Sequence, residues 1–261
     1  MVALPTPLRL LDSKVAVVTG AGTGLGAATA RALAREGAAV VLVGRRSDRL
    51  EETAASLGPD ARYVVFPGDV SQEETAAGAV KAAVAEFGGI DILVNNAGIH
   101  ARPVLVHETT VAEFDEFYSV DLKGPFLFTR AAAPRMLERG GGAVINISSM
   151  VALVGFMYSC AYAAAKGGLV ALTRATAADY GDGGIRANCI CPGGMEPVER
   201  GNLGPGDYDK LMQAVTRAGG TLVQRTAHVD EVAEMVLFLA GPNSQSLTGA
   251  VIPFDAGFTA H

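Results

Sequence analysis

Short apolar runs alternate with helical segments along nearly the whole chain, and this alternation limits the folds that the chain can adopt. Residues 15–18 read Val-Ala-Val-Val, a β-branched run of the kind that is buried on both faces of a sheet. Residues 24–36 then have a helical pattern that Gly37 is placed to end. Further strands are predicted at residues 39–43, 62–66, 91–94, 143–147, 185–190 and 250–254, and further helices at residues 48–57, 72–87, 111–138, 161–180 and 229–239. Within residues 111–138, Pro125 and Pro134 should kink the helix.

Strands and helices at this spacing predict a doubly wound parallel sheet with helices on both faces, a Rossmann-like α/β fold. In such a sheet the ligand crevice lies beyond the carboxyl ends of the strands. No linker, repeat or change of composition divides residues 1–261, so we expect a single domain. Residues 193–226 interrupt the alternation with a Gly- and Pro-rich stretch and a short helical segment at residues 208–217. A segment of this length predicts a substrate lid, with a disordered loop as the alternative.

The composition excludes several classes of protein. With 49% hydrophobic and 18% charged residues among 261, the chain is too apolar to be disordered. The net charge of −6 argues against a nucleic-acid or anionic-membrane partner. No apolar run reaches the roughly 18 residues of a membrane span. The 3 cysteines are too few for a disulfide scaffold or a metal site and favour free thiols in a reducing cytoplasm; they are Cys160, Cys189 and Cys191.

The first strand runs directly into a glycine-rich turn, Thr-Gly-Ala-Gly-Thr-Gly-Leu-Gly at residues 19–26. Glycines let the backbone approach a pyrophosphate, and the following helix offers free N–H groups and a positive dipole end. A turn of this kind between a buried strand and a helix predicts a dinucleotide site, and a purely structural turn is the alternative. The predicted phosphate-side residues are Gly20, Thr23, Gly24, Leu25 and Gly26.

The end of the second predicted strand indicates which dinucleotide is bound. An NAD site usually has Asp or Glu about 20 residues after the turn, where it binds the ribose 2′-hydroxyl. This chain has Gly44, Arg45 and Arg46 there. A guanidinium fits a 2′-phosphate, so NADP(H) is favoured. NAD(H) stays open as the alternative, since both arginines could simply be solvated.

Tyr162 and Lys166 are four residues apart on a predicted helix and therefore share one face. A phenol, with a pKa of about 10, is a poor acid or base at neutral pH. A neighbouring ammonium stabilises the phenolate, so we expect Lys166 to lower the pKa of Tyr162. Tyr162 would then exchange a proton with a carbonyl oxygen while the cofactor exchanges the hydride. Ser149, after residues 143–147, would donate a hydrogen bond to that oxygen.

Taken together, these residues resemble the short-chain dehydrogenase/reductase family over roughly residues 12–260. The turn at residues 19–26 is similar to the family's Thr-Gly-x-x-x-Gly-x-Gly, and Tyr162-x-x-x-Lys166 with Ser149 to its catalytic set. The other similar segments are Gly68-Asp69-Val70, Asn95-Asn96-Ala97-Gly98, Pro192-Gly193, Leu247-Thr248-Gly249 and Asp255-Ala256-Gly257.

The resemblance implies an NAD(P)-dependent oxidoreductase acting on a small carbonyl or alcohol, with a role like that of 3-oxoacyl-acyl-carrier-protein reductase as a common family outcome. It also implies a homo-oligomer, commonly a tetramer, packed partly through residues 111–138 and 161–180. Besides the turn, the cofactor-binding residues that it implies are Asp69, Val70, Asn96, Ala97, Gly98, Tyr162, Lys166, Pro192, Gly193 and Met195.

The chain departs from the family pattern at two positions. Asp121 stands where the family has an Asn that supports a water relay toward the lysine, partly through its main-chain carbonyl. A carboxylate adds negative charge near Lys166, so we expect the relay to be reduced but not abolished. Pro197 stands where many members have a Thr that binds the nicotinamide carboxamide.

The substrate is the least constrained part of the prediction. Residues 150–158 lie between the two catalytic elements, and Val151, Phe156 and Met157 are predicted to line an apolar pocket, with ordinary packing as the alternative. His100 is a further candidate contact, with an ordinary loop position as the alternative. Two other functions remain open: an NAD-dependent alcohol dehydrogenase of the same family, and a dinucleotide-binding sensor without turnover. The complete set of Ser149, Tyr162 and Lys166 favours an enzyme.

Overall fold

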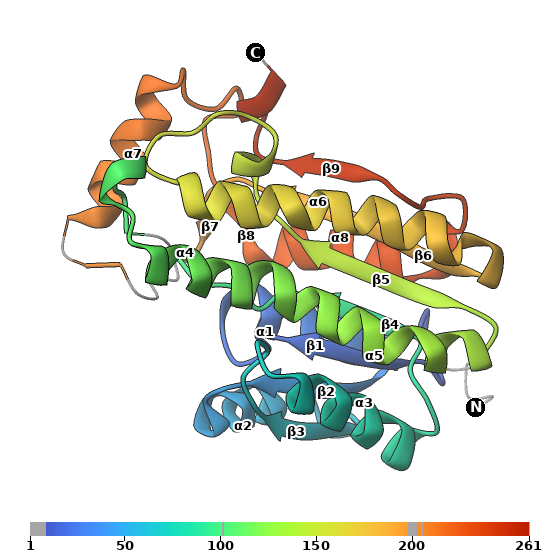
Figure 1. The fold of residues 1–261 in the computed structure, drawn as a ribbon. Coiled ribbons are helices and arrows are strands. Elements are labelled where there is room, and N and C mark those ends of the chain that lie inside the picture. Colours follow the sequence, from blue (N-terminus) through green and yellow to red (C-terminus); the bar gives the residue numbers. More distant parts are fainter. Residues whose placement is uncertain (1–8, 101, 198–202, 205, 261) are drawn as a thin grey trace, which may run out of the picture.

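The computed structural model describes residues 9–100, 102–197, 203–204 and 206–260, which fold around a seven-stranded sheet (Figure 1). The strands follow the order β3-β2-β1-β4-β5-β6-β9, and every pairing in this sheet is parallel. The strands are β1 (Val15–Thr19), β2 (Ala39–Gly44), β3 (Tyr63–Pro67), β4 (Ile92–Asn95), β5 (Gly142–Ile147), β6 (Ile185–Pro192) and β9 (Val251–Phe254). The predicted doubly wound α/β fold is confirmed. β2 and β4 flank β1, and at such a reversal of strand order the carboxyl ends border a crevice.

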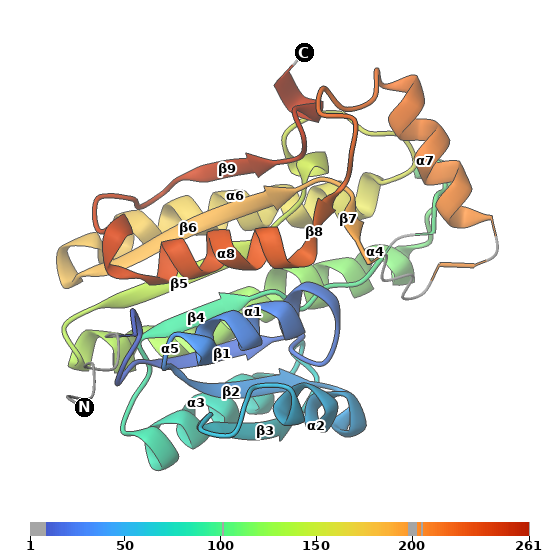
Figure 2. The ribbon, with the colours of Figure 1, turned by 180° about the vertical axis from the view of Figure 1, so that it is seen from behind.

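Helices cover both faces of the sheet. The face turned to the viewer in Figure 1 carries α3 (Glu73–Phe87), α5 (Gly124–Glu138) and α6 (Cys160–Tyr180). On the opposite face, seen in Figure 2, α1 (Gly24–Arg35) packs against α8 (Val229–Ala240), and α2 (Ser47–Ala55) lies beside α1. Apart from α5, the boundaries of these helices differ from the sequence prediction by at most two residues.

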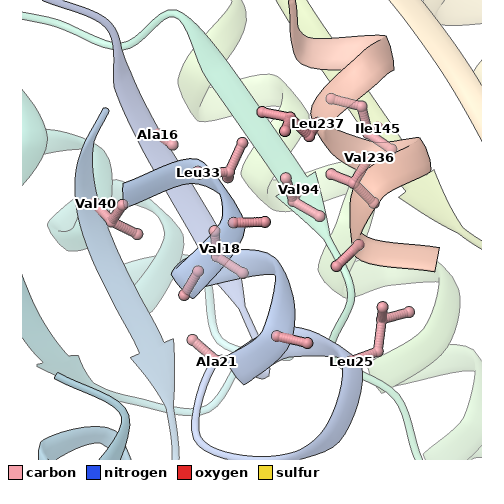
Figure 3. Packing of buried hydrophobic residues seen from close by; sticks show 14 of the residues in the cluster. Ala16, Val18, Ala21, Leu25, Leu33, Val40, Val94, Ile145, Val236 and Leu237 are labelled. Atoms are coloured by element: carbon pink, nitrogen blue, oxygen red, sulfur yellow. The ribbon is translucent and has the colours of Figure 1, made fainter. Parts of the chain in front are cut away.

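The central strands separate two apolar clusters. Ala16 and Val18 of β1 pack with Leu33 and Val236 on the α1/α8 side (Figure 3). The alternate residues of the same strand, Val15 and Val17, belong to the cluster on the α3/α5 side. Because successive side chains of a strand point to opposite faces, a strand that is buried on both sides must be apolar throughout. The unbroken apolar run in the sequence follows from this position.

The predicted helix at residues 111–138 is interrupted, but not in the way that its prolines suggested. The chain forms α4 (Val111–Phe117), then a π-helical segment η2 (Tyr118–Lys123), and then α5. Pro125 lies in the first turn of α5, where a missing N–H is tolerated. It has no N–H to donate to the carbonyl of Asp121, four residues earlier, which accounts for the loosened turn before it. The disturbance expected at Pro125 is therefore a π-helical segment that contains Asp121, whereas α5 continues through Pro134 without interruption.

The predicted lid, residues 193–226, contains the helix that the sequence predicted and a short strand that it did not. Residues 198–202 and 205 of this segment lie outside the described residues. The short helix is α7 (Asp207–Arg217), close to the predicted residues 208–217. The unexpected feature is a small parallel pairing of β7 (Met195–Glu196) with β8 (Ala227–His228). This pairing joins the start of the segment to the residues that directly follow its end, and so fixes the base of the predicted lid.

Candidate active site

The glycine-rich turn is held in place by the ends of β1 and β4. Thr19 accepts hydrogen bonds at its Oγ1 from the main-chain N–H groups of Asn96 (2.9 Å) and Ala97 (3.0 Å). The Asn96 side-chain amide donates in turn to the carbonyl oxygens of Thr19 (2.9 Å) and Gly20 (3.3 Å). Asn96 and Ala97 therefore shape the predicted cofactor site indirectly, through hydrogen bonds that fix the turn.

The turn has the geometry of a phosphate cradle. Gly20 and Gly24 have φ angles of +65° and +50°, which favour glycine, and a Cβ on Gly26 would overlap the carbonyl oxygen of Gly20. Thr23 makes no side-chain cap at the start of α1, and the first turn holds no acid, whereas α2, α3 and α8 each begin with at least one acid. The free N–H groups and positive helix end thus fit a pyrophosphate. Leu25 is 6% exposed and points into the core (Figure 3), so only its main chain can take part.

The end of β2 presents two free guanidinium groups. Arg45 and Arg46 are exposed, and within the described part of the chain neither forms an ion pair or hydrogen bond through its side chain. Nearby Arg49, by contrast, forms an ion pair, with its Nη1 2.7 Å from the Oε2 of Glu52. On the far side of the predicted adenine position, Asp69 accepts a hydrogen bond from the Ser71 N–H at 2.9 Å, which shapes the loop after β3.

The three predicted catalytic residues come together beyond the carboxyl end of β5. Tyr162 and Lys166 lie in the first turns of α6, with the Lys166 Nζ 5.7 Å from the centroid of the Tyr162 ring. Ser149 follows β5, and its side chain lowers the pKa of Tyr162, which favours the phenolate. Phe117 of α4 packs edge-on against the Tyr162 ring, with a centroid distance of 6.0 Å and an interplanar angle of 69°. Phe117 was not predicted from the sequence, although this residue lies four positions before Asp121 and therefore on the same side of the helix.

Asp121 forms a buried ion pair with Lys166. The Asp121 Oδ1 lies 2.9 Å from the Lys166 Nζ, and the two side chains are 0% and 4% exposed. The Lys166 Nζ also donates to the carbonyl oxygen of Ile147 at 3.0 Å, and the Asp121 Oδ2 accepts from the Ile99 N–H at 3.4 Å. A Cβ on Gly98 would lie 2.7 Å from the Asp121 Oδ1, so a glycine is needed beside the pair. The π-helical segment thus delivers a carboxylate to the predicted catalytic lysine.

The electrostatics of this cluster differ from the sequence expectation. Burial raises the pKa of Tyr162 and outweighs Lys166, which lowers it, while the charge of Asp121 raises it further. Lys166 thus lowers the pKa of Tyr162 as expected, but burial and the Asp121 carboxylate, which the expectation did not include, leave the pKa of Tyr162 raised overall. Burial alone would lower the pKa of Lys166, but Asp121 and Tyr162 outweigh it, and the pKa of Lys166 is raised. Lys166 therefore stays protonated at neutral pH.

The remaining predicted cofactor residues border the same edge of the sheet. Val70 is buried and packs against Gly124 at the start of α5. Pro192 ends β6, and the Gly193 N–H donates to the carbonyl oxygen of Phe254 at 3.0 Å, which joins this turn to β9. Met195 lies in β7 and packs against the core on the α1/α8 side, so its side chain is directed away from the cluster. Pro197 directly follows β7, and residues 198–202 lie outside the described part of the chain.

The predicted substrate residues are divided between packing and exposure. Phe156 packs edge-on against Phe258, with a centroid distance of 6.0 Å, and Val151 belongs to the same apolar cluster as Tyr162. Both side chains therefore lie in one apolar cluster, which forms a wall beside Tyr162. Met157 is 38% exposed, and His100 is exposed after the Asn95–Gly98 segment.

Comparison with known proteins gives the family. A family model described as enoyl-(acyl carrier protein) reductase, matching residues 20–259, fits almost the whole chain. The chain belongs to the short-chain dehydrogenase/reductase family. This short-chain dehydrogenase/reductase is 39% identical to cis-4-hydroxycyclohexanecarboxylate dehydrogenase of Sinomonas cyclohexanicum, over 95% of this chain and 97% of that protein. It is 37% identical to D-threitol dehydrogenase of Mycolicibacterium smegmatis, over 95% and 94% of the two chains.

Its fold is also that of a solved relative. The crystal structure of levodione reductase superimposes with a TM-score of 0.88 at 35% identity, covering 96% of this chain and 99% of that one. Relatives along the full length are named dehydrogenases and reductases, so the short-chain dehydrogenase/reductase described here is an oxidoreductase that transfers hydride with a nicotinamide dinucleotide. Among the described residues, no group of three or more His, Cys, Asp and Glu side chains is arranged to hold a metal ion. None of the described helices is long and apolar enough to span a membrane.

Proposed function

We propose that this enzyme interconverts a secondary alcohol and a ketone with NADP(H), and that Tyr162 is its general acid and base. The observation that carries the proposal is the meeting of Tyr162, Lys166 and Ser149 at the same sheet edge as the uncapped start of α1. A dinucleotide whose phosphates bind at that helix end extends along the crevice at the carboxyl ends of the strands, where these side chains lie. The whole chain then acts as a single cofactor-binding and catalytic domain.

Each residue of the cluster has a definite task in the reaction. The bound nicotinamide supplies or accepts the hydride. Tyr162 donates its phenolic proton to the carbonyl oxygen in reduction and takes it back in oxidation. Ser149 donates a hydrogen bond to the same oxygen, which stabilises the charge that develops there. Lys166 stabilises the phenolate that Tyr162 becomes, and Asp121 and the Ile147 carbonyl keep its ammonium in position.

The raised pKa of Tyr162 favours one direction of the reaction at neutral pH. A phenol below its pKa carries the proton that ketone reduction needs, whereas alcohol oxidation needs the phenolate. Because burial and Asp121 raise the pKa of Tyr162, the acid form is the abundant one at neutral pH. We therefore expect ketone reduction near neutrality and faster alcohol oxidation at alkaline pH.

NADP(H) is the proposed cofactor because Arg45 and Arg46 lie at the end of β2 with no partner in the described part of the protein. A 2′-phosphate would give both guanidinium groups a charged partner, whereas a bare ribose hydroxyl would leave them solvated. NAD(H) is the alternative, and the relative affinities of NADPH and NADH distinguish the two.

The proposed substrate is a compact carbonyl or alcohol rather than a carrier-bound acyl chain. This rests on the names of the relatives, which act on a hydroxycyclohexanecarboxylate and on threitol, and on the apolar wall of Val151, Phe156 and Phe258 beside Tyr162. His100 and Met157, whose side chains are exposed, are proposed as further substrate contacts.

A substrate panel tests the proposal. The panel contains cis- and trans-4-hydroxycyclohexanecarboxylate and D-threitol with NADP⁺ or NAD⁺, and levodione with NADPH or NADH, each followed at the nicotinamide absorbance band. We expect turnover of at least one compound and a preference for the phosphorylated cofactor. Tight cofactor binding without turnover of any compound would instead favour a dinucleotide-binding sensor.

We propose a homotetramer in the cytoplasm as the working form. Support comes from large apolar side chains at the surface of α4, η2 and α5: Phe114, Tyr118 and Phe126 are 47%, 51% and 46% exposed. The free thiols of Cys160, Cys189 and Cys191 suit a reducing compartment. Light scattering coupled to size-exclusion chromatography measures the mass directly and would give four times the chain mass.

A further inference from the structure

The lid helix α7 is connected to the substrate side of the site by one lysine. The Lys210 Nζ donates a hydrogen bond to the carbonyl oxygen of Pro103 at 2.8 Å. The same ammonium lies 4.5 Å from the centroid of the Tyr158 ring, in the geometry of a cation–π contact. Lys210 therefore joins three segments that are far apart in the sequence. In Figures 1 and 2, α7 lies beside the segment that leads into α4 and beside the loop that leads into α6.

Both partners of Lys210 belong to loops that carry active-site residues. Pro103 lies five residues after Gly98, whose missing side chain leaves room for the Asp121–Lys166 pair. Tyr158 lies four residues before Tyr162, in the loop between Ser149 and α6. Tyr158 has a φ of +65°, a left-handed conformation that a bulky side chain rarely adopts. Such a conformation persists only where the surrounding contacts maintain it, and Lys210 is one of these contacts.

Among the described residues, α7 buries few apolar side chains. Ala214 is its one buried side chain, and Val215 packs at the edge of the cluster formed by Met150, Val151 and Phe258. Met212 on the same helix is 38% exposed. A helix with so little buried apolar surface opens easily, so one charged hydrogen bond and one cation–π contact contribute a large share of its attachment.

Lys210 also lacks a competing partner. Within the described residues it forms no ion pair with a carboxylate, and the Asp207 side chain nearby accepts instead from the Gly204 N–H at 2.8 Å. The ammonium is therefore directed to the two loops and not to the surface acids of its own helix.

We propose that Lys210 is a positioning residue that holds α7 against the Pro103 and Tyr158 loops and thereby sets the affinity for the substrate. The proposal rests on the proposed function for the identity of the substrate side, but the attachment of α7 is testable without any substrate. Lys210 contacts neither the glycine-rich turn nor Tyr162, so its loss affects the KM of the substrate and leaves cofactor binding and the chemical step intact.

The first experiment is hydrogen–deuterium exchange on the full-length protein. Lys210→Met removes the ammonium and keeps the apolar stem, while Lys210→Arg keeps a cation. We expect the amides of α7 to exchange about tenfold faster in K210M, because both contacts are lost. K210R should restore slow exchange, and β1 and β4 should be unchanged in both variants. Lys81→Met, at an exposed lysine on α3, is the matched control.

The second experiment measures kinetics with cis-4-hydroxycyclohexanecarboxylate and NADP⁺. K210M should raise the KM of the alcohol about tenfold while kcat and the Kd of NADPH change by less than about twofold. Unchanged exchange in α7 of K210M would overturn the proposal, as would a fall in kcat with an unchanged KM or an equal effect of K81M. If the wild-type enzyme turns over no compound of the panel, the proposed function fails, while the exchange measurement still decides the role of Lys210 in holding α7.

Discussion

The carboxylate of Asp121 lies 2.9 Å from the ammonium of Lys166, and the two side chains are 0% and 4% exposed. Removing one member of a buried pair leaves the other charge uncompensated, which destabilises a protein by about 3–5 kcal/mol. An amide is usual at the position of Asp121 in the family pattern that the chain resembles, so the charge of this pair is a departure from that pattern. Its consequence is electrostatic, because the negative charge of Asp121 offsets part of the stabilisation that the Lys166 ammonium gives the Tyr162 phenolate.

Asp121→Asn should move the pH–rate profile toward lower pH. Asp121 raises the pKa of Tyr162, so its removal lowers that pKa as long as Lys166 remains protonated. Alcohol oxidation, which needs the phenolate, then rises at a lower pH, and ketone reduction, which needs the phenol, declines at a lower pH. Activity is retained in both directions, since the amide is the residue that the family uses.

Measuring the rates of oxidation and reduction as a function of pH, for wild type and Asp121→Asn, checks this shift. Asp115→Asn, an exposed carboxylate on α4, is the control and should leave the profile in place. Superimposable profiles for wild type and D121N would show that the carboxylate has no influence on Tyr162.

Arg45→Ala and Arg46→Ala should weaken NADPH binding and spare NADH. Loss of a charge-assisted contact with the 2′-phosphate corresponds to a rise of about 10- to 100-fold in the Kd of NADPH. Fluorescence titration of both cofactors measures the two constants. Arg31→Ala, at an exposed arginine of α1, is the control. Equal losses for NADPH and NADH in R45A and R46A, or tighter NADH binding by the wild type, would contradict the proposed cofactor.

Gly98→Ala should disturb the Asp121–Lys166 pair. The added Cβ would lie 2.7 Å from the Asp121 Oδ1 and 3.3 Å from the Lys166 Nζ, closer than the buried pair tolerates. We expect a loss of stability of about 1–3 kcal/mol and at least a tenfold fall in kcat. Gly181→Ala, where a Cβ meets nothing within 4 Å, is the control for thermal unfolding and activity. A wild-type melting temperature and kcat in G98A would mean that the pair shifts without consequence.

The fold followed from the sequence because its strongest signals are local. Val15 to Val18 are buried on both faces, and that position alone demands an apolar β-branched run. The turn that follows needs Gly20 at a positive φ, and the sequence has a glycine there. The β7–β8 pairing was not predicted because two residues per strand give no periodicity to detect. The π-helical segment was not predicted either, because Pro125 indicated a disturbance of the helix but not the form that it would take.

The site was predicted less completely, because its energetics depend on contacts between distant segments. Tyr162 and Lys166 lie on one helix, so their proximity could be predicted from spacing alone. The burial that raises the pKa of Tyr162 depends on how α4, β5 and α6 pack, which no local pattern encodes. The contact of Lys210 with Pro103 spans 107 residues and likewise leaves no trace in the sequence.

The account depends most on Tyr162 as the acid and base, and Tyr162→Phe tests this role directly. The measurement pairs the Kd of NADPH with kcat for the best compound of the panel, in wild type and Y162F. Loss of general acid–base catalysis should lower kcat about 10²- to 10⁴-fold while the Kd of NADPH stays the same. A Y162F enzyme that binds NADPH normally and keeps the wild-type kcat would contradict the account.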